Sequence, residues 1–242
     1  MDAALLLLAD SRLPAGGHGH SGGAEEAVRT GAITGPEDLA RFLRGRLTTA
    51  GLVAAALAAA ACELATAPGA AADQAGTRPD EPAAGAAPES AWRELDAEAD
   101  ARTASPAQRN AARTQGRLLL RSARRIWPSP ALDTLAGAVP DGAHHPIALG
   151  AVSAAAGCSP HDAALAAAYT SITGPATAAV RLLGLDPVVV HRVLAGLVPD
   201  LTSVARTAGA RAAWERLPAH AAPALDLLAE QHLRTEVRLF VS

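Results

Sequence analysis

The sequence predicts an all-α fold: a single bundle-like domain of about nine or ten helices spanning residues 1–242. Ser-Pro and Asp-Pro pairs recur along the chain, and proline is favoured at the first position of a helix. The β-branched residues are scattered and show no strand-like alternation. With 242 residues, half of them apolar, the chain is long enough to bury a substantial core.

The first two predicted helices flank a glycine-rich loop. A short apolar helix from Leu5 leads into Asp-Ser and Leu-Pro, a Gly/His loop follows, and a second helix opens with glutamates near Glu26. The whole stretch reads LLLLADSRLPAGGHGHSGGAEE. Its clustered glycines indicate a particular backbone shape, held between two helices, that another surface recognises.

Capping signals delimit the central helices. Thr34, with Glu37 three residues later, matches a capping box, and this helix is predicted to continue through the alanines to about Ala65. Ser105 and Pro106 start a helix that ends near Trp127, ahead of two prolines.

The remaining helices follow similar signals. One is predicted from about Pro146 to Gly157, the next two start at Ser159 and at Asp186, and the last two span Leu201–Leu217 and Ala222–Arg234. Gly157 is interpreted as the C-terminal cap of the first. Within the second, Gly174 and Pro175 predict a break between two helices, and a kink is the less favoured alternative.

Two segments have no helical pattern. Residues 67–90 are mostly Ala, Pro, Gly and acids without an apolar period, so they are predicted to form a mobile loop inserted between helices. The C-terminal tail, residues 235–242, carries the apolar sequence Leu-Phe-Val near its end. Two interpretations stay open for it: a peptide that docks on a partner, and a tail folded back on its own core.

Composition narrows the functional classes. A formal charge of -3 argues against nucleic-acid binding, which favours net positive charge. Cys62 and Cys158 are expected to be small core residues in a reducing compartment. Asp2 and the lack of a basic start argue against a signal peptide, and the apolar run Leu52–Cys62 is too short to span a membrane. The expected location is the cytoplasm.

No catalytic set is apparent in the sequence. The glycine loop lacks the Lys-Ser/Thr ending of a P-loop, and no Ser-His-Asp order or nucleophile elbow stands out, so a non-enzyme without cofactors is predicted. His18 and His20 are weak metal candidates, because two imidazoles alone leave a metal site unfilled. His144 and His145 are the other possible contributors.

A stripe of arginines recurs every four residues in the segment 109–125. Phosphate binding by this stripe is the less favoured interpretation, and ion pairing with the acids of segment 94–100 is preferred. Gly116 lies within the same predicted helix, where glycine costs about 1 kcal/mol relative to alanine, so it predicts a close approach of another helix.

Several of these segments resemble the UreF-type urease accessory proteins. The N-terminal loop is similar to the family's Leu-Pro-x-Gly-Gly turn with its later Ser, Gly and acid. Further resemblances are RNAARTQGRLLLRSA from Arg109, HPIALGAVSAAAG from His145, and the Ala-x-Arg-Leu ending at Leu182. The C-terminal RLFVS is similar to the family's Arg-Leu-Phe-x-Ser. The family's Pro-Leu-Gly-Gln after Arg-Leu is missing here, so any contact made by that Gln is lost.

The resemblance implies a non-enzymatic, dimeric, all-helical maturation factor. It would bridge the UreD/UreH-type accessory protein and the UreG-type GTPase, with apo-urease as the target of nickel insertion. The residues expected to bind these partners are Leu13, Pro14, Gly16, Gly17, His18, His20, Ser21, Gly23, Glu25, Gln115, Arg117, Tyr169, Arg181, Arg238, Leu239, Phe240 and Ser242.

One alternative comes from a different class. An all-helical regulatory protein would bind a small molecule in a pocket lined by Tyr169, tryptophans and histidines. Binding to urease accessory partners separates the two hypotheses.

Overall fold

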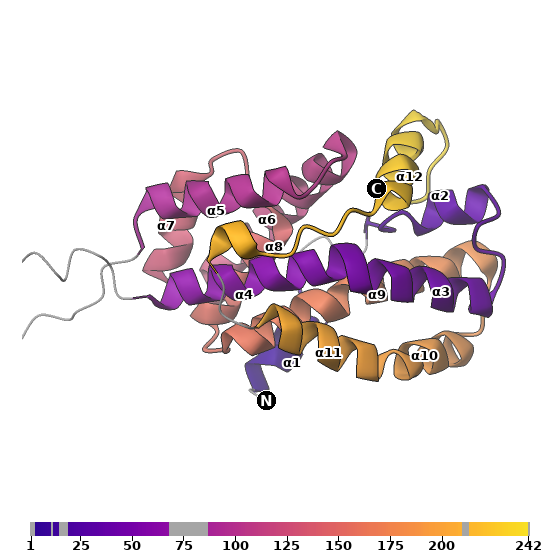
Figure 1. Cartoon of the computed structure of the whole chain (residues 1–242), viewed down its shortest axis with the longest axis horizontal. Coiled ribbons are helices and arrows are strands. Elements are labelled where there is room, and N and C mark those ends of the chain that lie inside the picture. Colours follow the sequence, from indigo (N-terminus) through magenta and orange to yellow (C-terminus); the bar gives the residue numbers. More distant parts are fainter. Residues whose placement is uncertain (1–2, 11, 15–18, 68–86, 210–212, 242) are drawn as a thin grey trace, which may run out of the picture.

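The computed structural model describes residues 3–10, 12–14, 19–67, 87–209 and 213–241, and these ranges contain helices and no strand, which confirms the all-α prediction. Figure 1 shows the arrangement. The helices are α1 (Ala3–Ala9), α2 (Ala24–Arg29), α3 (Pro36–Arg46), α4 (Leu52–Thr66), α5 (Glu89–Ala101), α6 (Pro106–Ile126), α7 (Pro130–Ala138), α8 (His145–Ala155), α9 (Pro160–Leu183), α10 (Pro187–Gly196), α11 (Val198–Ala208) and α12 (Pro223–Arg234).

A single long rod runs through the middle of the molecule (Figure 1). It consists of α3, a π-helical turn η2 (Leu47–Gly51) and α4, as the uninterrupted pattern from Thr34 to Ala65 predicts. The rod is long and apolar enough to cross a membrane, but 67% of its most apolar window is buried inside the protein. Such burial is typical of a core helix.

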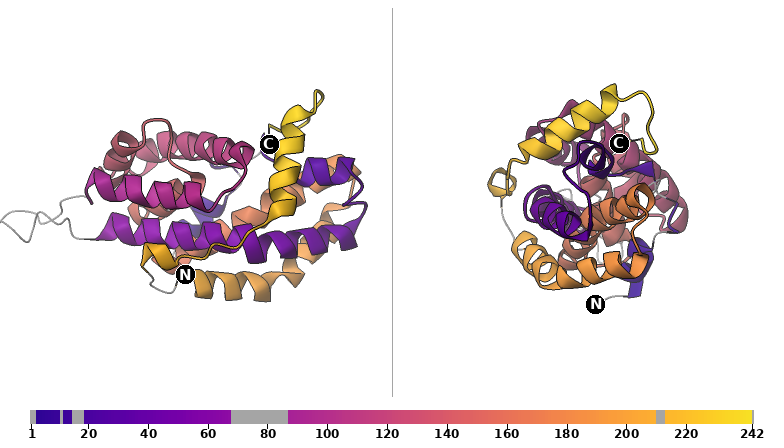
Figure 2. Two further views of the ribbon diagram at one scale, coloured as in Figure 1. Left: turned by 45° about the horizontal axis from the view of Figure 1, so that its top comes forward. Right: turned by 90° about the vertical axis from the view of Figure 1, so that its right-hand side faces the viewer.

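Helix α4 is the centre of the core, and α8, α9 and α11 pack around it (Figure 2). Nine of its fifteen residues are alanine or cysteine, and most of them are buried. At Gly150 of α8, a Cβ atom would lie 2.1 Å from the carbonyl oxygen of Ala58. The α4 and α8 backbones therefore come closer than any side chain at Gly150 permits.

The caps largely follow the sequence. The side chains of Ser105, Ser159 and Asp186 accept backbone N–H groups at the starts of α6, α9 and α10, and Ser159 forms a full capping box. Gly157 follows α8 with φ of +85°. At Thr34 the prediction was wrong in detail, because the Thr34 hydroxyl pairs with Asp38, 2.6 Å away, and the helix begins after Gly35.

Helix α9 does not break at Pro175, contrary to the favoured interpretation. It continues from Pro160 to Leu183 and ends at Gly184, which has φ of +63°. Proline has no N–H, so the carbonyl of Ser171, four residues earlier, loses its helical donor. Arg46 of α3 replaces that donor, with Nε 2.8 Å from the Ser171 oxygen. A side chain from another helix thus makes the proline tolerable.

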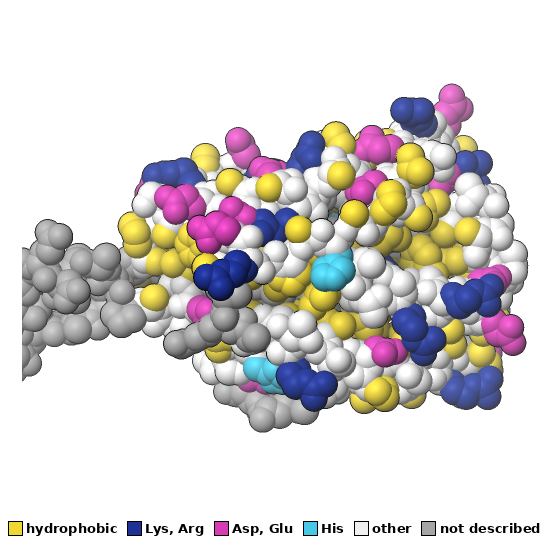
Figure 3. Space-filling view, in the orientation of Figure 1, with side chains coloured by type: hydrophobic (Ala, Val, Ile, Leu, Met, Phe, Trp, Pro, Cys, Tyr) yellow, Lys and Arg dark blue, Asp and Glu magenta, His cyan; other side chains and the backbone are white. Residues whose placement is uncertain are grey.

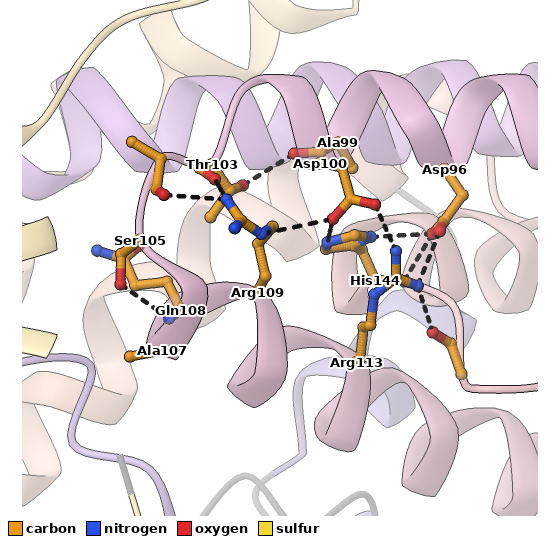
Figure 4. A network of polar contacts seen from close by, with 12 residues as sticks. Asp96, Ala99, Asp100, Thr103, Ser105, Ala107, Gln108, Arg109, Arg113 and His144 are labelled. Atoms are coloured by element: carbon orange, nitrogen blue, oxygen red, sulfur yellow. Dashed lines mark hydrogen bonds and ion pairs between the residues drawn. The ribbon is translucent and has the colours of Figure 1, made fainter. Parts of the chain in front are cut away.

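A buried polar network joins α5, α6 and the start of α8 (Figure 4). Arg113 donates to Asp96 at 2.9 Å and to Asp100 at 2.6 Å, and His144 places Nδ1 3.0 Å from Asp96. Arg109 binds the carbonyls of Thr103 and Ala104 and lies 3.8 Å from Asp100. The predicted ion pairing of the arginine stripe is confirmed for Arg109 and Arg113.

Gly116 lies where another segment passes very close to α6. A Cβ atom there would be 1.9 Å from the carbonyl oxygen of Ala143, which leads into α8. The predicted close approach is confirmed, although the segment that meets Gly116 precedes a helix instead of belonging to one. Of the predicted mobile loop 67–90, residues 68–86 lie outside the described ranges, whereas Ala87 is buried and α5 already begins at Glu89.

Candidate functional site

The N-terminal loop and the C-terminal tail meet beside α2, although more than 200 residues separate them in the chain. We call this contact the loop–tail junction; it comprises residues 19–25 and 237–241. The backbone N–H of Val241 donates to the carbonyl of Gly19 at 2.7 Å. The junction therefore brings together the two most distinctive motifs of the sequence.

Glu25 of α2 holds the tail in place. Its carboxylate accepts the backbone N–H of Leu239 at 2.6 Å and that of Phe240 at 3.0 Å. Hydrogen bonds to a carboxylate are stronger than those between neutral groups. Nε2 of buried His232 lies 3.3 Å from the Phe240 carbonyl oxygen and 3.8 Å from the Glu25 carboxylate. Both backbone polar groups of Phe240 are thus satisfied.

The tail side chains divide into a buried anchor and exposed neighbours. Phe240 is only 6% exposed and joins the main hydrophobic core, so in this structure the tail folds back on its own chain. Leu239 and Val241 are more than 60% exposed, and Val237 is 90% exposed. A partner that binds the junction in this conformation meets Leu239 and Val241, while Phe240 positions them.

Helix α12 attaches this tail to the body of the protein. The carboxylate of Glu230 accepts the Ser105 hydroxyl at 2.6 Å and the Ala107 N–H at 2.9 Å, at the N-terminus of α6. These hydrogen bonds lower the pKa of Glu230, as expected for an anion at a helix N-terminus. Asp226 accepts the N–H of Ser105 at 3.2 Å as well. Two acids of α12 therefore bind the start of α6.

The loop needs glycine where it meets α2. Gly22 and Gly23 have φ of +59° and +90°, in the left-handed region that other residues rarely adopt. The carbonyl of Gly22 accepts Nη1 of Arg46 at 2.9 Å. Arg46 thus connects the loop to the Ser171 carbonyl of α9, and the sequence analysis missed it. Pro175 inside a long helix was the signal, because its missing N–H calls for an outside donor.

The histidine candidates are placed differently. His18 lies outside the described residues, and His20 is 9% exposed, with a pKa lowered by burial. Burial, with a smaller contribution from nearby His20, lowers the pKa of His145 to about 4. Among the described residues the one cluster with metal-ligand spacing is Asp96, Asp100 and His144, and Arg113 already neutralises its carboxylates.

The other predicted residues do not form one surface. Ser21 is buried, Leu13 packs against the core, and the Pro14 carbonyl accepts the Ser122 hydroxyl at 2.7 Å. Gln115 and Tyr169 line a cavity behind the loop. Arg117 and Arg181 are exposed on separate helices, α6 and α9, and Arg238 is exposed in the tail. Gly16, Gly17 and Ser242 lie outside the described residues.

The described part of the site consists of backbone hydrogen bonds, one clamping carboxylate and exposed apolar side chains. Acid and arginine side chains are interspersed with apolar ones on the face shown in Figure 3, without a broad patch of one charge. A surface of this kind suits contact with another protein, and the fold defines an all-helical binding scaffold.

The comparisons with known proteins identify the family. The UreF family model matches residues 33–198. The urease accessory protein UreF of Mycobacterium sp. (strain JLS) is 46% identical to this chain over 238 residues. The match covers 98% of this chain and 97% of the relative. The protein of this name in Mycolicibacterium vanbaalenii is 44% identical over 240 residues, covering 99% and 98%. The chain belongs to the UreF family of urease accessory proteins, which are maturation factors and not enzymes.

Proposed function

We propose that this chain bridges a UreD/UreH-type accessory protein and a UreG-type GTPase during nickel insertion into apo-urease. Support comes from the family membership and from the loop–tail junction, which presents apolar side chains at a fixed position. In this proposal the chain acts as a homodimer in the cytoplasm and contributes binding surfaces only.

The single observation that carries the proposal is the exposure of apolar side chains on a tail whose backbone is hydrogen-bonded at residues 239–241. Glu25 and Gly19 bind three consecutive N–H groups of the tail, at 2.6–3.0 Å, so Leu239 and Val241 are displayed without further ordering. A preorganised surface loses less conformational entropy when a partner binds. On α12, Leu227 and Leu233 are also more than half exposed and extend the apolar character of this region.

Co-purification with the UreD/UreH-type protein tests this proposal. Leu239→Asp should abolish or strongly weaken the complex, because it places a charge among side chains that the partner would bury. Its melting temperature alone should stay near that of the wild type, because Leu239 is 62% exposed.

The matched control is Val188→Asp, which introduces the same charge at an exposed valine of α10, away from the junction. This variant should bind the partner normally. Normal complex formation by Leu239→Asp would refute the assignment of the junction, whereas loss of binding in both variants would mean that added negative charge alone opposes the complex.

A further inference from the structure

A cavity of about 700 Å³ lies behind the N-terminal loop; α3–α4, α6, α9 and α12 form most of its wall, and α1, α5, α8, α10 and Phe240 of the tail contribute further residues. This volume is within the range typical of small-molecule sites. Its wall is mostly apolar, and it includes His20, Arg46, His145 and Tyr169. The family assignment gives this space no role, so its chemistry has to be inferred from the side chains that line it.

Among the described residues that line this cavity, Arg46 is a cationic side chain that pairs with no carboxylate. Two arginines line the space, and the other, Arg102, pairs with the Glu98 carboxylate and donates to four backbone carbonyls. Arg46 donates to two carbonyl oxygens and has no carboxylate partner among the described residues. Burial lowers its pKa to about 10, which leaves it positively charged at neutral pH.

The acids of the cavity wall are already engaged. Asp10 pairs with Arg12 at 2.7 Å, and Asp226 accepts the N–H of Ser105 and the amide of Gln108. Nη2 of Arg46 has no hydrogen-bond partner among the described residues. A guanidinium can bind a carboxylate through more than one N–H, so Arg46 retains the capacity for such a contact.

An apolar stripe continues from Arg46 along the same rod. Ala50 follows Arg46 by four residues, Val53 and Ala54 follow Ala50 by three and four, and Leu57 follows Ala50 by seven; all of them line the cavity. Residues at this spacing share one face of a helix. The cavity thus offers a cationic group at one end and an apolar wall leading away from it.

We propose that this cavity binds a small organic carboxylate, with its anionic group on Arg46 and its aliphatic body along Ala50, Val53, Ala54 and Leu57. Nε and Nη1 of Arg46 keep their bonds to Ser171 and Gly22, and the ligand occupies the remaining edge. Because Arg46 also holds the N-terminal loop, the bound carboxylate stabilises the loop in the conformation described here. This inference does not depend on the partner assignment.

Tyr169 gives a direct readout, because it is the only tyrosine in the chain and lines the cavity. The full chain labelled with 3-fluorotyrosine should show one ¹⁹F resonance. Titration with hexanoate at constant ionic strength should shift it saturably. Hexanamide, which has the same body without the charge, and acetate, which lacks the body, should each bind at least tenfold more weakly.

Arg46→Gln should weaken hexanoate binding at least tenfold, and Arg44→Gln, at an exposed arginine of the same helix that pairs with Asp200, should leave it unchanged. Equal binding of hexanoate and hexanamide, or no saturable shift, overturns the proposal. Unchanged hexanoate binding by Arg46→Gln overturns it too. If Arg46→Gln fails to fold, the comparison of hexanoate with hexanamide on the wild-type chain decides alone.

Discussion

Phe240→Ala tests how much the tail contributes to the stability of the chain itself. Phe240 is 6% exposed and contacts the main core, and truncating a buried phenylalanine to alanine costs about 3–5 kcal/mol in well-packed sites. The tail is a chain end that is able to shift into the space left behind, so a loss of about 2–4 kcal/mol is expected. For a chain of 242 residues, 1 kcal/mol corresponds to roughly 2–4 °C in melting temperature.

The assay is thermal unfolding of the isolated chain followed by circular dichroism at 222 nm. Phe240→Ala should lower the melting temperature by about 5–15 °C. Leu239→Ala is the control, because Leu239 is 62% exposed and its truncation should change stability by less than about 0.5 kcal/mol. An unchanged melting temperature for Phe240→Ala would show that the tail is not packed on the core in solution, and partner docking would become its main role.

Three further predictions concern the body of the protein. Gly116→Ala should lower the free energy of unfolding by more than about 2 kcal/mol, because its Cβ would lie 1.9 Å from the Ala143 oxygen. Gly45→Ala in α3, with open space around it, is the control and should raise the free energy of unfolding by up to about 1 kcal/mol. Chemical denaturation measures both, and equal effects would contradict the close approach. Asp96→Ala should cost about 1–3 kcal/mol by the same assay, because it removes the buried carboxylate that Arg113 and His144 share, while Asp100 still pairs with Arg113. A loss under about 0.5 kcal/mol would show that the network is solvated. The pKa of His145 falls from 6.5 to about 4 on folding. Between these pH values the unfolded chain binds a proton that the folded chain does not. The free energy of unfolding should therefore decrease as pH falls from about 6.5 to 4, by no more than about 3 kcal/mol. His145→Asn should flatten this slope and the same change at exposed His191 should not; a slope unchanged by His145→Asn would assign it to other groups.

Local signals in the sequence were enough to predict the class of fold and most helix boundaries. Ser105, Ser159 and Asp186 cap their helices through bonds to residues two or three positions away. Such contacts are local, so their geometry follows from the order of residues alone. The same holds for Gly157, whose positive φ ends α8.

The functional site depended on pairings that the order of residues does not reveal. The sequence singled out the loop and the tail separately, but only the tertiary structure decided that Glu25 binds the tail backbone and that Phe240 turns inward. An apolar end has two ways to leave water, docking on a partner or folding back, and the same hydrophobic effect drives both.

The sequence by itself determined that the chain is helical, where most of its helices begin (α5 and α7 were not predicted), and that Gly116 and the N-terminal glycines need special surroundings. The tertiary structure decided which groups supply those surroundings. Pro175 shows the difference: its missing N–H is certain from the sequence, and local reasoning therefore predicted a break. The helix continues because Arg46, 125 residues away from Ser171 in the chain, reaches the freed carbonyl oxygen. A donor from a distant segment becomes available only when packing brings the two helices together.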